Sequence, residues 1–189
     1  MTASEAFKPS LIGVAGLVAV AASLYAAPGI AGLAGAGFGL IMLAVAVIDA
    51  RRLVIPDELS ALAFALGLAG VGFERWSDMP APALETLIRA GAMAAVFLAF
   101  RIGYRRLRGR EGMGLGDVKL AGVAGIWLDW PSLPIAIEIA ALGALAFVAM
   151  ARIGARRAPD PLTKLPFGAF FAPAIWMCWL MERWWSWAV

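Results

Sequence analysis

The sequence predicts an all-α protein: a polytopic transmembrane helical bundle of about seven spans, with six as the alternative, and a cytoplasmic N-terminus. Composition is the first observation. Of 189 residues, 62% are hydrophobic and 15% are charged, and the mean hydropathy is +0.84. A soluble domain of this length needs more polar surface to cover its core. The second observation is that the apolar residues form runs close to the roughly 20 residues that a helix needs to cross a membrane.

Proline and glycine separate these runs where chain reversals are expected. The fifth run is short and rich in glycine, which favours a helix partly buried inside the bundle. The first could be a cleaved signal peptide, but the short gap to the second favours a retained helix. The expected spans are residues 10–27, 30–49, 58–73, 84–104, 116–130, 132–152 and 167–187.

Basic residues set the expected orientation, because cytoplasmic loops carry an excess of Lys and Arg. With the N-terminus inside, Arg75, Arg89 and Arg183 lie near the opposite side, where tryptophans form an aromatic belt. Lys119 is assigned to neither side, because it lies two residues from Asp117, a candidate site residue described below. Twelve of the sixteen basic residues then lie on the cytoplasmic side: Lys8, Arg51, Arg52, Arg101, Arg105, Arg106, Arg108, Arg110, Arg152, Arg156, Arg157 and Lys164.

The same composition excludes several function classes. The net charge of +3 is explained by membrane topology and lipid headgroups, so no nucleic-acid partner is expected. The chain has one Cys and no His, which excludes a disulfide framework, a Cys/His zinc cluster and a histidine base. The sequence contains no signal for an oligomeric state.

Two acidic residues border spans at one membrane face. Asp49 ends the second span and Asp117 begins the fifth. Two complete crossings separate them, so both belong at the same face, which the charge distribution makes cytoplasmic. A pair of carboxyl groups is therefore possible there.

The two acids occupy opposite helix ends. A negative charge is disfavoured at a helix C-terminus and favoured at an N-terminus. Our hypothesis is that Asp49 holds a shared proton while Asp117 is ionised, so that the pair activates a water molecule.

Glycines precede the second acid. Gly112, Gly114 and Gly116 allow backbone conformations closed to other residues and let a substrate strand approach closely. The alternative is an ordinary turn into a helix with Asp117 as its N-cap.

These residues resemble the motifs of the type IV prepilin peptidases, aspartic membrane proteases with a Gly-x-Gly-Asp signature. In that family an Asp closes one helix and Pro-Asp or Pro-Asn opens the next, as Asp49 and Pro56-Asp57 do here. The run from Gly112 to Leu120, with Asp117 and Lys119, is similar to the second motif. Leu165-Pro166-Phe167-Gly168 is similar to a third, and the motif-bearing region covers about 30–188.

The resemblance implies an aspartic endopeptidase that cleaves short basic leaders from prepilins or pseudopilins at the cytoplasmic face of the inner membrane, in type IV pilus or type II secretion systems. It implies catalysis by Asp49 and Asp117 without a metal or cofactor, in a membrane-embedded domain surrounded by lipid. Six other residues are expected to shape the site or bind substrate: Gly112, Gly114, Gly116, Pro56, Asp57 and Lys119. The acidic residues expected to meet the basic leader are Asp57, Glu58 and Glu111.

Many bacterial members also carry a domain with two Cys-x-x-Cys pairs that methylates the new N-terminus. Only Cys178 is present here, so the expectation is a single peptidase domain over residues 1–189 without the N-methyltransferase domain.

Two other functions remain as alternatives. A transporter or channel could use the two acids for proton or cation passage, although such sites usually lie near the membrane midplane. A non-catalytic assembly subunit of a pilus or secretion system is the second. A presenilin-like protease needs a Tyr-Asp motif, which is absent, and a His-Glu-x-x-His metalloprotease is excluded because the chain has no His.

Overall fold

The structure is a computed structural model that describes residues 9–74, 81–154 and 165–188, and these ranges contain seven helices and no strand. The expected fold class is therefore confirmed as all-α. The helices are α1 (Pro9–Ala26), α2 (Gly29–Arg52), α3 (Asp57–Glu74), α4 (Ala81–Arg108), α5 (Leu115–Trp127), α6 (Ser132–Gly154) and α7 (Gly168–Ala188).

Every expected span coincides with one helix, and the bounds differ by at most four residues. Four of the helices, α1, α2, α4 and α6, have the length and apolar composition needed to cross a membrane. The shortest, α5, has 13 residues and is therefore about 20 Å long. Most of its residues from Asp117 to Ile126 are buried, which confirms the expectation of a short helix inside the bundle.

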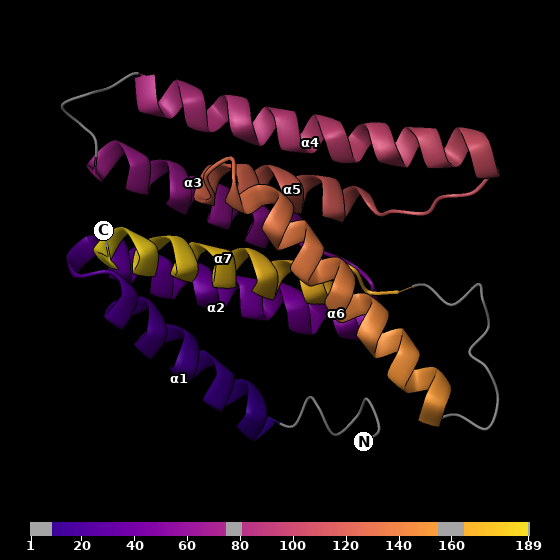
Figure 1. The fold of residues 1–189 in the computed structure, drawn as a ribbon, viewed down its shortest axis with the longest axis horizontal. Helices are drawn as coiled ribbons and strands as arrows, with labels where there is room; N and C mark the ends of the chain where they lie inside the picture. Colours follow the sequence, from indigo (N-terminus) through magenta and orange to yellow (C-terminus); the bar gives the residue numbers. More distant parts are fainter. Residues whose placement is uncertain (1–8, 75–80, 155–164, 189) are drawn as a thin grey trace.

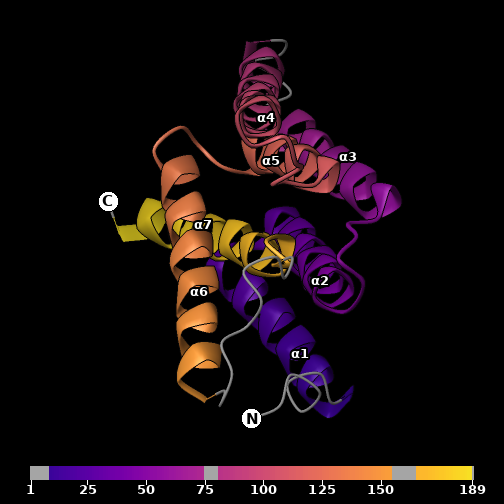
Figure 2. The same ribbon diagram turned by 90° about the vertical axis from the view of Figure 1, so that its right-hand side faces the viewer.

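Consecutive helices run in opposite directions, as Figure 1 shows. Helix α5 packs most extensively on α4 and also contacts α3 and α7, while α2 packs against α1 and α7. In the end-on view of Figure 2, α4 lies outside α5 and α3, and α1 and α6 lie on the opposite side of the α2–α7 pair. The C-terminal end of α2 and the N-terminal ends of α5 and α7 meet at one end of the bundle (Figure 1). Asp49 and Asp117 therefore lie at the same end, as their positions in the sequence predict.

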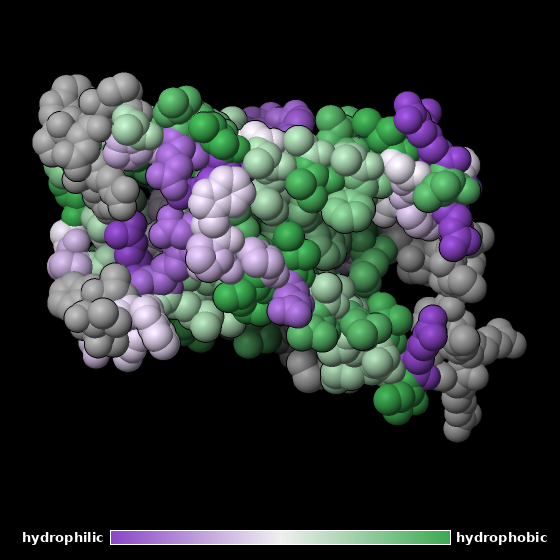
Figure 3. Space-filling view, turned by 45° about the horizontal axis from the view of Figure 1, so that its top comes forward, coloured by the Kyte–Doolittle hydropathy of each residue, from purple (hydrophilic) through white to green (hydrophobic). Residues whose placement is uncertain are grey.

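The surface fits a membrane environment. On the face drawn in Figure 3, hydrophobic residues occupy most of the middle, and hydrophilic residues concentrate toward the two ends. The basic residues that close α2, α4 and α6 lie at the Asp49 end. Lys8, Arg75, Trp76, Arg156, Arg157 and Lys164 are outside the described residues.

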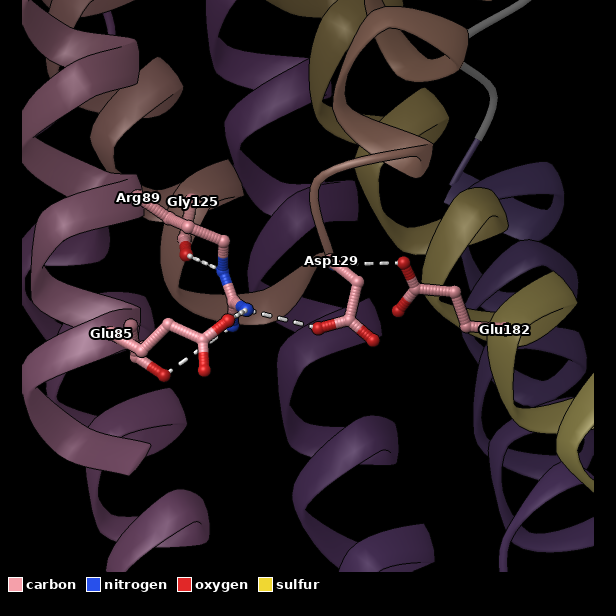
Figure 4. Close-up of polar contacts among 6 residues, drawn as sticks. Glu85, Arg89, Gly125, Asp129 and Glu182 are labelled. Carbon is pink, nitrogen blue, oxygen red and sulfur yellow. Dashed lines mark hydrogen bonds and ion pairs between the residues drawn. The ribbon is translucent and has the colours of Figure 1, made fainter. Parts of the chain in front are cut away.

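A polar cluster at the opposite end joins α4, α5 and α7 (Figure 4). Arg89 of α4 is 8% exposed, and its guanidinium donates to the carbonyl oxygen of Gly125 at 3.3 Å. It also forms ion pairs with Glu85 at 3.2 Å and Asp129 at 3.1 Å. The backbone N–H of Asp129 donates to Glu182 of α7 at 2.9 Å. Because the last carbonyl groups of a helix lack intrahelical partners, Arg89 caps α5 and fixes the end of this helix that is distant from Asp117.

Candidate active site

Asp49 lies in the last turn of α2 and is 5% exposed. Its Oδ2 accepts a hydrogen bond of 2.9 Å from the backbone N–H of Ala169, the second residue of α7. The first N–H groups of a helix have no intrahelical acceptor and carry a partial positive charge, so they bind carboxylates well. Asp49 is therefore held between the C-terminus of its own helix and the N-terminus of α7.

Asp117 is the third residue of α5 and is 9% exposed. Its Oδ2 accepts a hydrogen bond of 3.1 Å from the backbone N–H of Gly114, which occupies the N-cap. An acid at the third helical position that binds the N-cap N–H forms one half of a capping box. The alternative of Asp117 as the N-cap is therefore wrong, because that position belongs to Gly114.

Ile55 connects the two helix ends that carry the acids. The chain leaves α2 through Leu53, whose φ of 56° is left-handed, and this turn leads to Ile55, which is buried. A methyl group placed on Gly116 would lie 2.8 Å from Ile55 Cβ. One placed on Gly168 would lie 2.7 Å from Ile55 Cδ1 and 3.0 Å from Asp49 Oδ2. The ends of α2, α5 and α7 thus converge on one side chain, and the Asp49 and Asp117 carboxyl groups are close enough to interact electrostatically.

The glycines before Asp117 do not have the special backbone conformation expected of them, and their close approach to a substrate strand stays a prediction. Among the described glycines only Gly29 and Gly109 have a positive φ, so Gly112, Gly114 and Gly116 do not require a conformation closed to other residues. Two of them instead allow close packing. A methyl group on Gly112 would lie 2.5 Å from the ring of Tyr104, and Gly116 lies against Ile55.

Asp57 begins α3 directly after Pro56. Its carboxylate forms an ion pair with Lys119 of α5 at 2.6 Å. Both line a cavity of about 680 Å³ between α3, α4 and α5, and Asp117 is not among its lining residues. Since residues two apart on a helix point in nearly opposite directions, Lys119 and Asp117 face different sides of α5. A role of this pair in substrate binding stays a prediction.

The acids expected to meet a basic leader are mostly engaged already. Asp57 pairs with Lys119, and Glu111 pairs with Arg101 at 2.6 Å and with Arg105 at 3.8 Å. Glu58 is exposed in the first turn of α3. Among the described residues, no group of three or more His, Cys, Asp or Glu side chains could hold a metal ion.

The hypothesis about the shared proton loses part of its physical basis. It assumed that Asp49 faces only the negative end of α2, but the N-terminus of α7 also lies against this carboxyl group. Both acids accept a backbone N–H from the start of a helix. Which acid holds the proton stays a prediction.

Sequence reasoning missed Ile55 and the backbone N–H of Ala169. The signal for Ala169 was present in Leu165-Pro166-Phe167-Gly168, because Gly168 begins α7 directly beside Asp49. Ile55 carried no comparable signal, since it reads as one apolar residue in a short connection.

Fold and site together define a helical membrane protein that holds two buried carboxyl groups at one end of its bundle. The sequence model of the type IV leader peptidase family matches residues 36–149, a segment that contains both Asp49 and Asp117. The chain belongs to the type IV leader peptidase family and is a multi-pass inner-membrane protein.

Several curated proteins named prepilin leader peptidase/N-methyltransferase are similar to it. The protein from Pseudomonas aeruginosa is 32% identical over 137 residues, which are 72% of this chain and 45% of that protein. The protein from Burkholderia pseudomallei is 36% identical over 160 residues, 82% of this chain and 48% of that protein. The protein from Aeromonas hydrophila is 29% identical over 175 residues, which are 89% of this chain and 57% of that protein. The chain thus spans about half the length of the curated relatives it matches. No solved structure matches it.

Proposed function

We propose that this chain is an aspartic endopeptidase that removes the short basic leader from prepilins or pseudopilins. The observation that carries this proposal is the convergence of Asp49 and Asp117, from the ends of two helices, inside the segment that matches the family. The printed names of the relatives, which pair a prepilin leader peptidase with a methyltransferase, support the substrate class.

Two neighbouring carboxyl groups supply what amide hydrolysis needs. Close carboxyl groups share one proton, because both cannot easily be ionised at once. The ionised group takes a proton from water while the water oxygen attacks the scissile carbonyl carbon. The neutral group donates a hydrogen bond to the carbonyl oxygen, which becomes negative. Transfer of a proton to the amide nitrogen then lets the carbon–nitrogen bond break, and the pair returns to its starting state.

We propose that the reaction takes place at the cytoplasmic face, with seven crossings and the N-terminus inside. This orientation is supported by the basic residues that close α2, α4 and α6 at the Asp49 end. The position of both acids at helix ends, rather than halfway along the helices, fits cleavage at a membrane surface better than ion passage through the membrane.

Cleavage of a purified prepilin by the purified chain in detergent or liposomes tests the proposal. The expected product begins at the residue after the leader, as measured by intact mass and N-terminal sequencing. A chelator of divalent metals is expected to leave the rate unchanged, because the two carboxyl groups supply the acid and the base. Absence of cleavage, or cleavage within the mature region, would contradict the proposed function.

Gly168→Ala is expected to slow cleavage by about 10- to 100-fold, because displacements of 1 Å at a reacting group cost rates of this order. The added methyl group would press on Ile55 and on the Asp49 carboxyl group. Initial rates of leader removal measure the effect. Gly103→Ala is the matched control, because a methyl group there has no neighbour within 4 Å. Equal rates for the two variants would show that the contact at Gly168 does not hold Asp49 in place.

A further inference from the structure

The connection between α4 and α5 is held by an arginine from within α4. Arg101 donates from Nη1 to the carbonyl oxygen of Met113 at 2.5 Å and from Nη2 to Glu111 Oε1 at 2.6 Å. Its side chain is only 13% exposed, although it lies near the basic end of α4. Hydrogen bonds from a guanidinium to a carboxylate are strong, and the planar group fixes the direction of both contacts.

These contacts lead directly to one of the two acids. Met113 precedes Gly114 in the chain, and the N–H of Gly114 donates to Asp117 Oδ2 at 3.1 Å. Gly112, on the other side of Met113, lies against the ring of Tyr104 in α4. The segment before α5 is thus attached to α4 at consecutive positions, and its last residue orients the Asp117 carboxyl group.

The neighbouring arginines of α4 do not share this arrangement. Arg105, one turn further on, is 68% exposed and approaches Glu111 only at 3.8 Å. Arg106 and Arg108 are exposed. A basic residue that served only to set membrane orientation would need no partly buried guanidinium with two directed hydrogen bonds.

We propose that Arg101 is a positioning residue for the peptidase reaction: it fixes the Glu111–Gly114 segment, and through the Gly114 N–H it sets the orientation of Asp117. This role rests on the proposed function. Arg101 contacts neither the substrate nor the reacting atoms, so its loss lowers the rate of the chemical step without weakening the binding of the prepilin.

Steady-state kinetics on a purified prepilin separate positioning from general stability. Arg101→Gln is expected to lower kcat by about tenfold or more, as displaced reacting groups do, with KM unchanged. Arg101→Lys keeps the charge but cannot make both directed contacts, so its kcat is expected to lie between those of wild type and Arg101→Gln. Arg105→Gln is the matched control, and its kcat is expected to equal that of the wild type. A wild-type kcat for Arg101→Gln, a loss confined to KM, or an equal loss in Arg105→Gln would overturn the proposal.

Limited trypsin digestion tests the attachment of the segment without any peptidase activity. Arg110 is exposed and directly precedes the segment, so cleavage there yields a fragment that begins at Glu111. Arg101→Gln is expected to speed this cleavage by about tenfold, since two hydrogen bonds to a charged group are lost, whereas Arg105→Gln leaves it near the wild-type rate. An unchanged rate in Arg101→Gln would refute the attachment. If wild type cleaves no prepilin, the proposed function is wrong, and with it the proposal that Arg101 positions Asp117 for catalysis. The trypsin result still decides whether Arg101 holds the segment.

Discussion

Asp49→Asn and Asp117→Asn are each expected to abolish detectable leader removal while the protein stays in the membrane. An amide has nearly the shape of a carboxyl group, so it can still accept the backbone N–H from Ala169 or Gly114. It cannot take a proton from water or share one with its neighbour. General acid–base catalysis contributes about 10²- to 10⁴-fold, and a loss of that size leaves no visible product in a gel-shift assay.

The double variant sharpens this prediction. If the two acids act as one unit, removal of the second should cost little more than removal of the first, because effects within one catalytic group are far from additive. Glu138→Gln, which changes an exposed acid of α6, is the control and should cleave like wild type. Each variant is co-expressed with a prepilin, and its amount in the membrane is measured by immunoblotting. Full cleavage by either single Asn variant would remove the carboxyl pair from the mechanism.

Gly125→Ala is expected to lower the stability of the protein. Here α5 approaches α4 so closely that an added methyl group would lie 2.6 Å from the backbone atoms of Ala90 and Arg89. Backbone atoms cannot move aside as the end of a side chain can, so the two helices would have to separate. Overpacking of this kind typically costs about 1–3 kcal/mol, and the melting temperature of the purified protein should fall.

Gly91→Ala is the matched control for this effect. Gly91 lies on α4 beside Ala90, but a methyl group there has no neighbour within 4 Å. Because glycine within a helix is destabilising by roughly 0.5–1 kcal/mol relative to alanine, Gly91→Ala should raise the melting temperature slightly. The two substitutions therefore have opposite expected signs. A similar shift of the melting temperature in both variants would show that α5 does not approach the backbone of α4 this closely at Gly125.

The helices and the shared location of the two acids could be predicted from the sequence, because both depend on local patterns. Apolar runs between proline and glycine fix where the helices lie, and the alternation of direction then brings Asp49 and Asp117 to one end. The end of α5 was less predictable. The expected span continued to residue 130, whereas the helix ends at Trp127 and the chain becomes extended at Leu128.

The contacts that shape the site could not be predicted in the same way, because they join residues distant in the sequence. Asp49 accepts a hydrogen bond from Ala169, 120 residues away, and no periodicity connects these positions. The glycines illustrate a related difficulty. A sequence shows that Gly116 lacks a side chain, but it does not show whether the reason is backbone conformation or the nearness of Ile55. Arg101 looked like its neighbours for the same reason, since only its partial burial distinguishes it from Arg105, Arg106 and Arg108, which follow it in α4.

The packing around Ile55 also limits how this site can change during evolution. Ile55, Gly116 and Gly168 come from three separate segments but fill a single space. A larger residue at 116 or 168 is compatible with this geometry only if residue 55 becomes smaller, so the three positions should covary among family members. The two motifs that carry the acids therefore depend on the start of the last helix in two ways: through a hydrogen bond, and through the space that their side chains share with it. A segment exchanged with that of a relative would have to carry matching residues at all three positions.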